Sequence, residues 1–224
     1  MLVRDAMTRN PITVTPDTRL PEIDSLMREH RIRRVPVVEG GRLVGIISLG
    51  DVIATMPSAS STLSRWEAST LLDKLQARDF MTSPVYATTP ECALEEVANF
   101  LLEKKIGALP VLDGEALTGI VTESDIFRVF VDMLSGGAEV PGLRFELRGG
   151  RQRAVVVKVS QLVYEHGGRI VTIATVNEAD GEHKRILVKE EGADAERLTE
   201  ALWASDVEVL DVRQRQQPNI CIVS

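Results

Sequence analysis

The chain has 224 residues and carries 33 acidic against 26 basic side chains, for a net charge of −7 at pH 7. It is 44% hydrophobic but only 4% aromatic, so a largely aliphatic core is expected, in one large or two small domains. An acidic chain repels nucleic-acid phosphates, which argues against general DNA or RNA binding and leaves room for a local basic pocket.

The cysteines and the N-terminal residues bear on location. Charges at Arg4, Asp5 and Arg9 interrupt the N-terminal segment, which excludes an apolar signal-peptide core. No stretch approaches the roughly 20 apolar residues of a membrane span. Cys92 and Cys221 match neither a metal spacing nor a disulfide framework. We therefore expect a cytoplasmic protein in a reducing compartment, without a membrane partner.

An internal repeat organises the N-terminal part of the chain. The residues Val-Arg-Asp-Ala-Met-Thr around Met7 read again as Ala-Arg-Asp-Phe-Met-Thr around Met81, 74 positions later. A duplication is the simplest explanation, because the same offset holds along both copies. It relates Pro16 to Pro90, Leu20 to Leu94, Glu29 to Glu103, Ile32 to Ile106, Pro36 to Pro110, Gly45 to Gly119 and Asp51 to Asp125.

Each copy is predicted to follow the order β-α-β-β-α. Short strands at residues 12–15 and 85–88 precede a proline turn, and apolar residues then recur at helical spacing. The predicted buried faces of these helices are Ile23, Leu26, Met27 and His30 in the first copy and Leu94, Val97, Ala98 and Leu101 in the second.

A strand pair and a second helix complete each copy. Glycine-containing turns, Gly40-Gly41 and Asp113-Gly114, favour hairpins. The hairpin strands are expected at residues 34–38 and 43–47, and again at 108–112 and 117–121. A further helix is predicted to begin near Asp51 and near Asp125.

Breakers divide the chain into domains. A Pro- and Ser-rich run at residues 57–61 follows the first copy, a helix is predicted at 63–75, and glycines and a proline follow the second copy. The predicted organisation is a first repeat at 1–56, a linker with a helix at 57–73, a second repeat at 74–134, a linker at 135–142, a third domain at 143–215 and a tail at 216–224.

The third domain does not continue the repeat and is predicted to follow the ferredoxin-like order βαββαβ. A helix with Val155, Val159 and Val163 on one face is expected to end at Gly167-Gly168. The valine run at 155–157 is compatible with a strand as well. The other predicted elements are strands at 144–147, 170–176 and 185–189, a turn near Asp180-Gly181, a helix at 193–205 and a last strand from Val207.

Two short segments carry the functional signal. Residues 45–51 and 119–125 each place Ser48 or Thr122 at a strand end and an aspartate three residues later, at a helix start. An isolated S/T-x-x-D is most often a helix cap with its capping-box acid. Here, however, the same frame precedes both segments: a Pro-Val strand, a turn and Gly-Ile.

The two repeats resemble CBS domains, whose nucleotide signature is G-h-x-S/T-x-x-D, and their tandem arrangement resembles the Bateman module. The resemblance implies that Asp51 and Asp125 accept hydrogen bonds from ribose hydroxyls, with Ser48 and Thr122 near the phosphates. An acceptor-only carboxylate matches a cis-diol, and helix N-terminal amides favour an anion. The expected fold class is α+β, two CBS units followed by a ferredoxin-like, ACT-like domain.

Basic residues ahead of the first Pro-Val strand are candidate phosphate ligands. Arg31, Arg33 and Arg34 stand there, and the guanidinium groups of Arg33 and Arg34 suit phosphate oxygens. The second copy has Lys105 and then Gly107-Ala108, so the cleft served by the arginines is expected to suit a phosphate-bearing nucleotide better. The resemblance places Thr13, Val35, Ala87 and Leu109 against the base, although these residues are also compatible with ordinary core.

The C-terminal domain resembles an ACT domain, and the order CBS–CBS–ACT resembles the acetoin-utilisation B-type proteins. ACT domains often bind amino acids at a first strand-to-helix turn that carries an acidic residue and Pro-Gly. Here that turn, residues 148–152, has two glycines and no acid. The domain is therefore expected to serve mainly in dimerisation through its sheet.

The favoured function is regulatory. AMP, ADP, ATP or another adenosyl compound would shift the angle between the CBS copies of a homodimer, and the C-terminal domain would signal to a partner protein. A link to acetoin or acetate metabolism follows from the resemblance. The alternative is an oligomerisation subunit without a ligand.

Catalysis is disfavoured by the sequence. His30 and His166 fall on apolar helix faces and His183 in a polar loop, and no Ser-His-Asp order, zinc motif or P-loop is present. We therefore assign no catalytic residue, catalytic cofactor or metal ligand.

Overall fold

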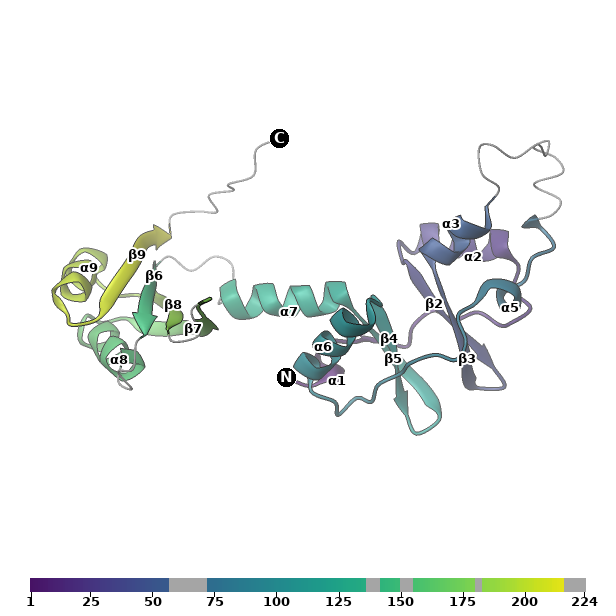
Figure 1. Ribbon diagram of the computed structural model, residues 1–224, viewed down its shortest axis with the longest axis horizontal. Coiled ribbons are helices and arrows are strands. Elements are labelled where there is room, and N and C mark those ends of the chain that lie inside the picture. Colours follow the sequence, from purple (N-terminus) through teal and green to yellow (C-terminus); the bar gives the residue numbers. More distant parts are fainter. Residues whose placement is uncertain (57–71, 136–141, 150–154, 180–182, 216–224) are drawn as a thin grey trace. The chain divides into compact units, whose positions relative to one another are not determined.

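The computed structural model describes residues 1–56, 72–135, 142–149, 155–179 and 183–215, which form two compact units, Met1–Arg128 and Val129–Ser224 (Figure 1). Several features singled out in the sequence lie wholly or largely outside the described residues: the run at 57–61, the helix predicted at 63–75, the linker at 135–142, the turns at 148–152 and 180–181, and the tail at 216–224 with Cys221. No helix in the described part of the chain is long and apolar enough to cross a membrane.

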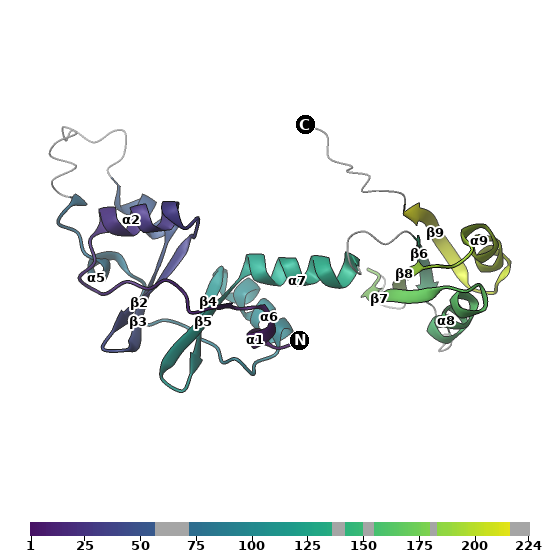
Figure 2. The same cartoon turned by 180° about the vertical axis from the view of Figure 1, so that it is seen from behind.

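Both repeats adopt the predicted helix–hairpin–helix order, visible from two sides in Figures 1 and 2. The hairpin turns hold Gly40, Gly41 and Gly114 at positive φ, a backbone region that glycine enters without steric cost. The first copy contains α2 (Leu20–Glu29), β2 (Arg34–Glu39), β3 (Arg42–Ser48) and α3 (Leu49–Thr55). The second contains α6 (Leu94–Lys104), β4 (Ala108–Asp113), β5 (Ala116–Thr122) and α7 (Glu123–Ser135).

The first strand expected in each copy is reduced to a single pairing. Val14 forms one parallel bridge with Val37, and Thr88 forms one with Val111. The pairing does not extend in the first copy, because the amide of Thr15 turns back to donate to the Thr18 hydroxyl at 3.0 Å. Each of these segments therefore makes one bridge to the neighbouring hairpin and does not form a strand.

The helices bury the predicted faces with one exception. In α2, Leu20, Ile23 and Met27 are buried, whereas His30 lies exposed just beyond the helix end. The prediction that His30 shares the apolar face is wrong, because the helix ends at Glu29 and the chain turns away through Arg31 at φ 53°.

The N-terminal segment of each copy packs on the other copy. These segments hold α1 (Val3–Ala6), β1 (Thr8–Arg9) and α5 (Ala77–Phe80), which are too short to show a hydrophobic period. Strand β1 pairs with β5, placing Thr8 opposite Ile120. In the same way Thr82 exchanges two backbone hydrogen bonds with Ile46, at 2.9 and 3.1 Å.

Two glycines allow this exchange. A Cβ at Gly119 would lie 2.5 Å from Met7 Sδ, and a Cβ at Gly45 would lie 2.9 Å from Met81 Cγ, both inside normal contact distance. Each methionine side chain thus packs on the backbone of a glycine in a strand of the other copy, where no Cβ is present. The repeat relates the two contacts, because it relates Gly45 to Gly119 and Met7 to Met81.

The second unit has the predicted ferredoxin-like order and an antiparallel sheet in the order β7-β8-β6-β9. The valine run is helical, since Val155, Val159 and Val163 are buried on one face of α8. Gly167 follows that helix at φ 79°. The elements are β6 (Gly142–Gly149), α8 (Val155–Glu165), β7 (Arg169–Asn177), β8 (Lys184–Glu191), α9 (Ala195–Ala204) and β9 (Glu208–Arg215).

Replacing Gly45 by alanine is expected to lower the free energy of unfolding of the first unit by about 1–3 kcal/mol, because the new methyl group overlaps Met81. Denaturant titration measures this change. Gly50→Ala is the matched control: its Cβ would meet only Ser48 Oγ at 3.4 Å, so no loss is expected. An equal effect of Gly45→Ala in wild-type and Met81→Ala backgrounds would contradict the packing account.

Candidate functional site

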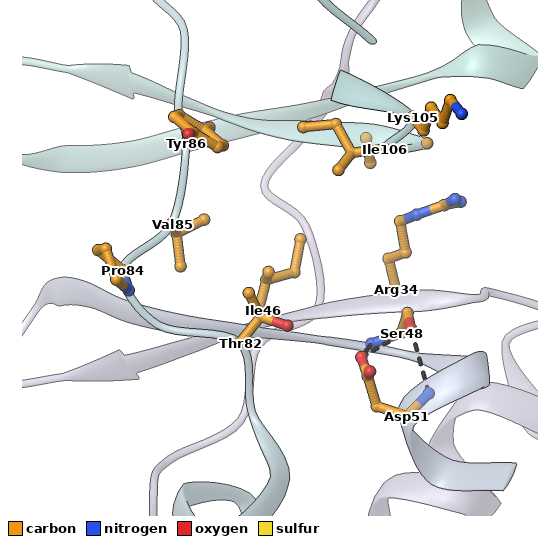
Figure 3. Close-up of a pocket in the computed structure, with 12 residues that line it drawn as sticks. Arg34, Ile46, Ser48, Asp51, Thr82, Pro84, Val85, Tyr86, Lys105 and Ile106 are labelled. Atoms are coloured by element: carbon orange, nitrogen blue, oxygen red, sulfur yellow. Dashed lines mark hydrogen bonds between the residues drawn. The ribbon is translucent and has the colours of Figure 1, made fainter. Parts of the chain in front are cut away.

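Two clefts in the first unit are related by the repeat, and each is built from both copies. The cleft around Asp51, the Asp51 cleft, has a volume of about 330 Å³. Its first-copy side includes Ile46 and Ser48, and its second-copy side consists of Thr82, residues 84–86 and residues 105–108. Figure 3 shows residues 84–86 along one side and Arg34 with Asp51 on the other.

The cleft around Asp125, the Asp125 cleft, has a volume of about 450 Å³ and the reverse composition. Ile120, Thr122 and Ser124 come from the second copy, while Thr8, residues 10–12 and residues 31–34 come from the first. Residues 31–34 of the first copy thus lie in the cleft of Asp125, and Lys105 of the second copy lies in the cleft of Asp51.

In the Asp51 cleft, Ser48 and Asp51 form a capping box at the start of α3. Asp51 Oδ2 accepts from the Ser48 amide at 2.7 Å and from its hydroxyl at 2.6 Å, and Ser48 Oγ accepts from the Asp51 amide at 3.2 Å. The two hydrogen bonds that the Asp51 carboxylate accepts both end on Oδ2. Its Oδ1 has no protein partner among the described residues. The carboxylate therefore caps the helix with one oxygen and offers the other to the cleft.

The Asp125 cleft repeats the capping box and adds one contact. Asp125 Oδ2 accepts from the Thr122 amide at 2.9 Å and from its hydroxyl at 2.7 Å. Here Oδ1 also accepts a hydrogen bond, at 2.7 Å, from Arg128 Nη2. The residue that corresponds to Arg128 in the first copy is Ala54, which cannot donate.

The basic residues are distributed unequally. Arg31, Arg33 and Arg34 line the Asp125 cleft, while Arg34 and Lys105 line the Asp51 cleft. Arg34 reaches both clefts because Gly107 has no side chain: a Cβ there would overlap the Arg34 guanidinium. The two arginines singled out from sequence thus lie together with Thr122 and Asp125, and Arg34 also lies beside Ser48 and Asp51.

The four residues expected against the base do not line either cleft. Val35 and Leu109 are buried in the core, and Thr13 and Ala87 are exposed. Neighbours one position away line the clefts instead: Ile12, Arg34, Tyr86 and Ala108. The shift has a simple cause in the two strands, where successive side chains point to opposite faces.

Tyr86 gives the Asp51 cleft an aromatic surface that the sequence did not single out. Its ring meets Phe100 edge to face, with centroids 5.2 Å apart, and Lys104 Nζ lies 5.8 Å from the Phe100 centroid. The pKa of Lys104 is raised above its ordinary value, chiefly by its hydrogen bond to Glu103. Ile12 stands at the corresponding place in the Asp125 cleft, so the two clefts offer a base different surfaces.

The CBS domain model matches residues 3–58 and 77–132, and the chain belongs to the CBS-domain family. The chain is similar to protein MJ1225 of Methanocaldococcus jannaschii, with 31% identity over 132 residues that make up 58% of this chain and 47% of MJ1225. The solved structure of MJ1225, described as a proposed archaeal homolog of g-AMPK, matches with a TM-score of 0.50.

Two further relatives show how far the similarity extends. A proposed acetoin utilization protein (AcuB) from Vibrio cholerae is 32% identical, with a TM-score of 0.51, over 60% of this chain and 93% of AcuB. Inosine-5'-monophosphate dehydrogenase of Aquifex aeolicus is 31% identical over 184 residues, 81% of this chain but 34% of the enzyme. The chain thus spans about half of MJ1225 and about a third of the dehydrogenase.

Replacing Ser48 by alanine is expected to lower the free energy of unfolding by about 1 kcal/mol, because the hydroxyl that caps α3 is lost. Chemical denaturation of the variant measures the change. Ser25→Ala is the control, since Ser25 is exposed within α2 and alanine suits that position. Equal stability of Ser48→Ala and wild type would contradict the assigned cap.

Proposed function

We propose that the chain is a regulatory protein that binds an adenosyl nucleotide, such as AMP, ADP or ATP, in its CBS pair. One observation carries this proposal: Asp51 lines a cleft with Oδ1 free of protein partners among the described residues, and Arg34, Lys105 and Tyr86 line the same cleft. A carboxylate oxygen accepts hydrogen bonds from a ribose diol. Membership of the CBS family supports the same ligand class.

The other residues of the Asp51 cleft take complementary roles in this proposal. Arg34 and Lys105 contact the phosphate, with Ser48 beside it, because cations form short charge-assisted hydrogen bonds with phosphate oxygens. Tyr86 contacts the base, since its ring face is a stacking surface. The acceptor, the cations and the aromatic ring of this cleft match the ribose diol, the phosphate and the base of an adenosine monophosphate.

Regulation follows from the composite construction of the clefts. A ligand in the Asp51 cleft contacts Ser48 and Asp51 of the first copy and Tyr86 and Lys105 of the second, so it favours one angle between the copies. We propose that a homodimer, paired partly through the sheet of its second unit, passes this change to a regulated partner protein. The similarity to AcuB supports a role in acetoin metabolism.

Wild-type protein is expected to bind adenosine at least about tenfold more tightly than 2′-deoxyadenosine, because hydrogen bonds to a charged group contribute about 1.5–3 kcal/mol. Asp51→Ala should weaken adenosine binding and abolish the preference. Isothermal titration of both ligands against both proteins measures it. Equal affinity of the wild type for the two nucleosides would refute the ribose assignment, and binding of neither would favour an oligomerisation subunit without a ligand.

Lys105→Gly is expected to weaken AMP binding about tenfold while leaving adenosine binding unchanged, because only AMP carries the phosphate. Glycine is tolerated there, since Lys105 has φ 54°. Arg31→Gly is a matched control: Arg31 has φ 53° and lines the other cleft. Titrations of AMP and adenosine compare the variants. The phosphate assignment fails if Lys105→Gly weakens both ligands equally.

A further inference from the structure

The two clefts differ most sharply in the state of their aspartates. The side chain of Asp125 is only 8% exposed, and its Oδ1 accepts a hydrogen bond from Arg128 Nη2 at 2.7 Å. Arg128 itself is 62% exposed and also lies 3.4 Å from the carbonyl oxygen of Ala6. Asp51 Oδ1 accepts no such hydrogen bond from the described residues, because the first copy has Ala54 at the position that corresponds to Arg128.

This pairing opposes ribose binding at Asp125. Oδ2 is held by the amide and hydroxyl of Thr122, and Oδ1 is held by a charged donor. These three donors leave one of about four acceptor positions on the carboxylate, so a diol that donates both of its hydroxyls would have to displace an existing bond. The bond from Arg128 is charge-assisted and roughly twice as strong as a bond from a neutral hydroxyl. The carboxylate that resembles a ribose acceptor in sequence is therefore largely occupied by protein donors.

The remaining lining of the Asp125 cleft suits an anion. Arg31, Arg33 and Arg34 contribute three guanidinium groups, and Ser124 contributes a hydroxyl. The pair with Arg128 compensates the negative charge of Asp125, which would otherwise repel an anion in the same cleft. Guanidinium groups bind phosphate oxygens in a bidentate manner, so the cleft matches a chain of phosphates.

We propose that Arg128 determines the specificity of the second cleft: by occupying the Asp125 carboxylate it converts a ribose site into a site for a phosphate-rich anion. This inference rests on the proposed function, because it takes the Asp51 cleft as the ribose site. The two clefts then select different chemistry, a diol at Asp51 and phosphates at Asp125. Arg34, which lines both clefts, lies between them.

Adenosine and inorganic triphosphate separate the two kinds of recognition, because the first has a diol without phosphate and the second has phosphates without a diol. Wild-type protein is expected to bind one adenosine per chain, and Arg128→Ala two. Arg128→Ala should also weaken triphosphate binding about tenfold, since the Asp125 charge is left uncompensated. Equilibrium titration gives both stoichiometry and affinity, and ATP in parallel shows whether a nucleotide's phosphates bind there as free triphosphate does.

Matched variants assign the sites. Asp51→Ala should bind no adenosine, and Asp51→Ala/Arg128→Ala should bind one. Arg128→Gln, which keeps the length of the side chain without its charge, should behave as Arg128→Ala. Arg28→Ala removes a comparable helical pair, with Asp24 in α2, and should change neither ligand.

The outcomes separate this inference from the proposed function. Two adenosines per wild-type chain, or unchanged binding of both probes by Arg128→Ala, would overturn the role of Arg128 and leave ribose binding at Asp51 standing. If neither the wild-type protein nor Arg128→Ala binds adenosine, the proposed function is overturned, and this inference with it.

Discussion

The exchange of N-terminal segments between the two copies is the constraint on which the ligand-binding geometry depends. Thr82 hydrogen-bonds to Ile46, and Thr8 lies opposite Ile120. These contacts bring the residues before β4 to the carboxylate of the first copy and the residues before β2 to that of the second. Lys105 thus lies in the Asp51 cleft, and Arg31 and Arg33 lie in the Asp125 cleft. A ligand in either cleft consequently contacts both copies, which is the requirement for coupling binding to their arrangement.

Duplication followed by local divergence explains how one scaffold holds two different clefts. The turn glycines, the capping boxes and the Met–Gly contacts are retained in both copies, so the backbone of each cleft is similar. The divergence lies in side chains that line or adjoin the clefts. Ile12 corresponds to Tyr86, Arg33 to Gly107, Arg34 to Ala108 and Ala54 to Arg128. Each of these changes alters charge, hydrogen bonding or aromatic surface while leaving the helices and strands in place.

Periodicity and turn chemistry predicted most of the fold. The helix at Val155–Glu165 and the hairpins at Gly40-Gly41 and Gly114 are confirmed, since apolar spacing and positive-φ glycines are local signals. Elements of two to four residues, such as Thr8–Arg9, carry no period and were not predicted.

The site was predicted less completely than the fold. Ser48, Asp51, Thr122 and Asp125 are identified by a local motif, and the structure places each pair in one cleft. Which arginine faces which aspartate depends on contacts between copies, which no spacing encodes. Val35 and Leu109, expected against the base, are buried in the core, and their strand neighbours Arg34 and Ala108 line the clefts, because successive side chains of a strand point to opposite faces. The Arg128–Asp125 contact is an i,i+3 pair on one helix, and such pairs are common on helix surfaces. The sequence does not show that this pair adjoins a cleft.

A crystal structure of the full chain grown with AMP tests the central claim most directly. The account predicts density for AMP in the Asp51 cleft, with the ribose hydroxyls on Asp51 Oδ1, the phosphate near Arg34 and Lys105, and the base against Tyr86. Arg128 should remain on Asp125. A ribose on Asp125 with the Asp51 cleft free of nucleotide would contradict the assignment of the two clefts and require the opposite account of their specificity.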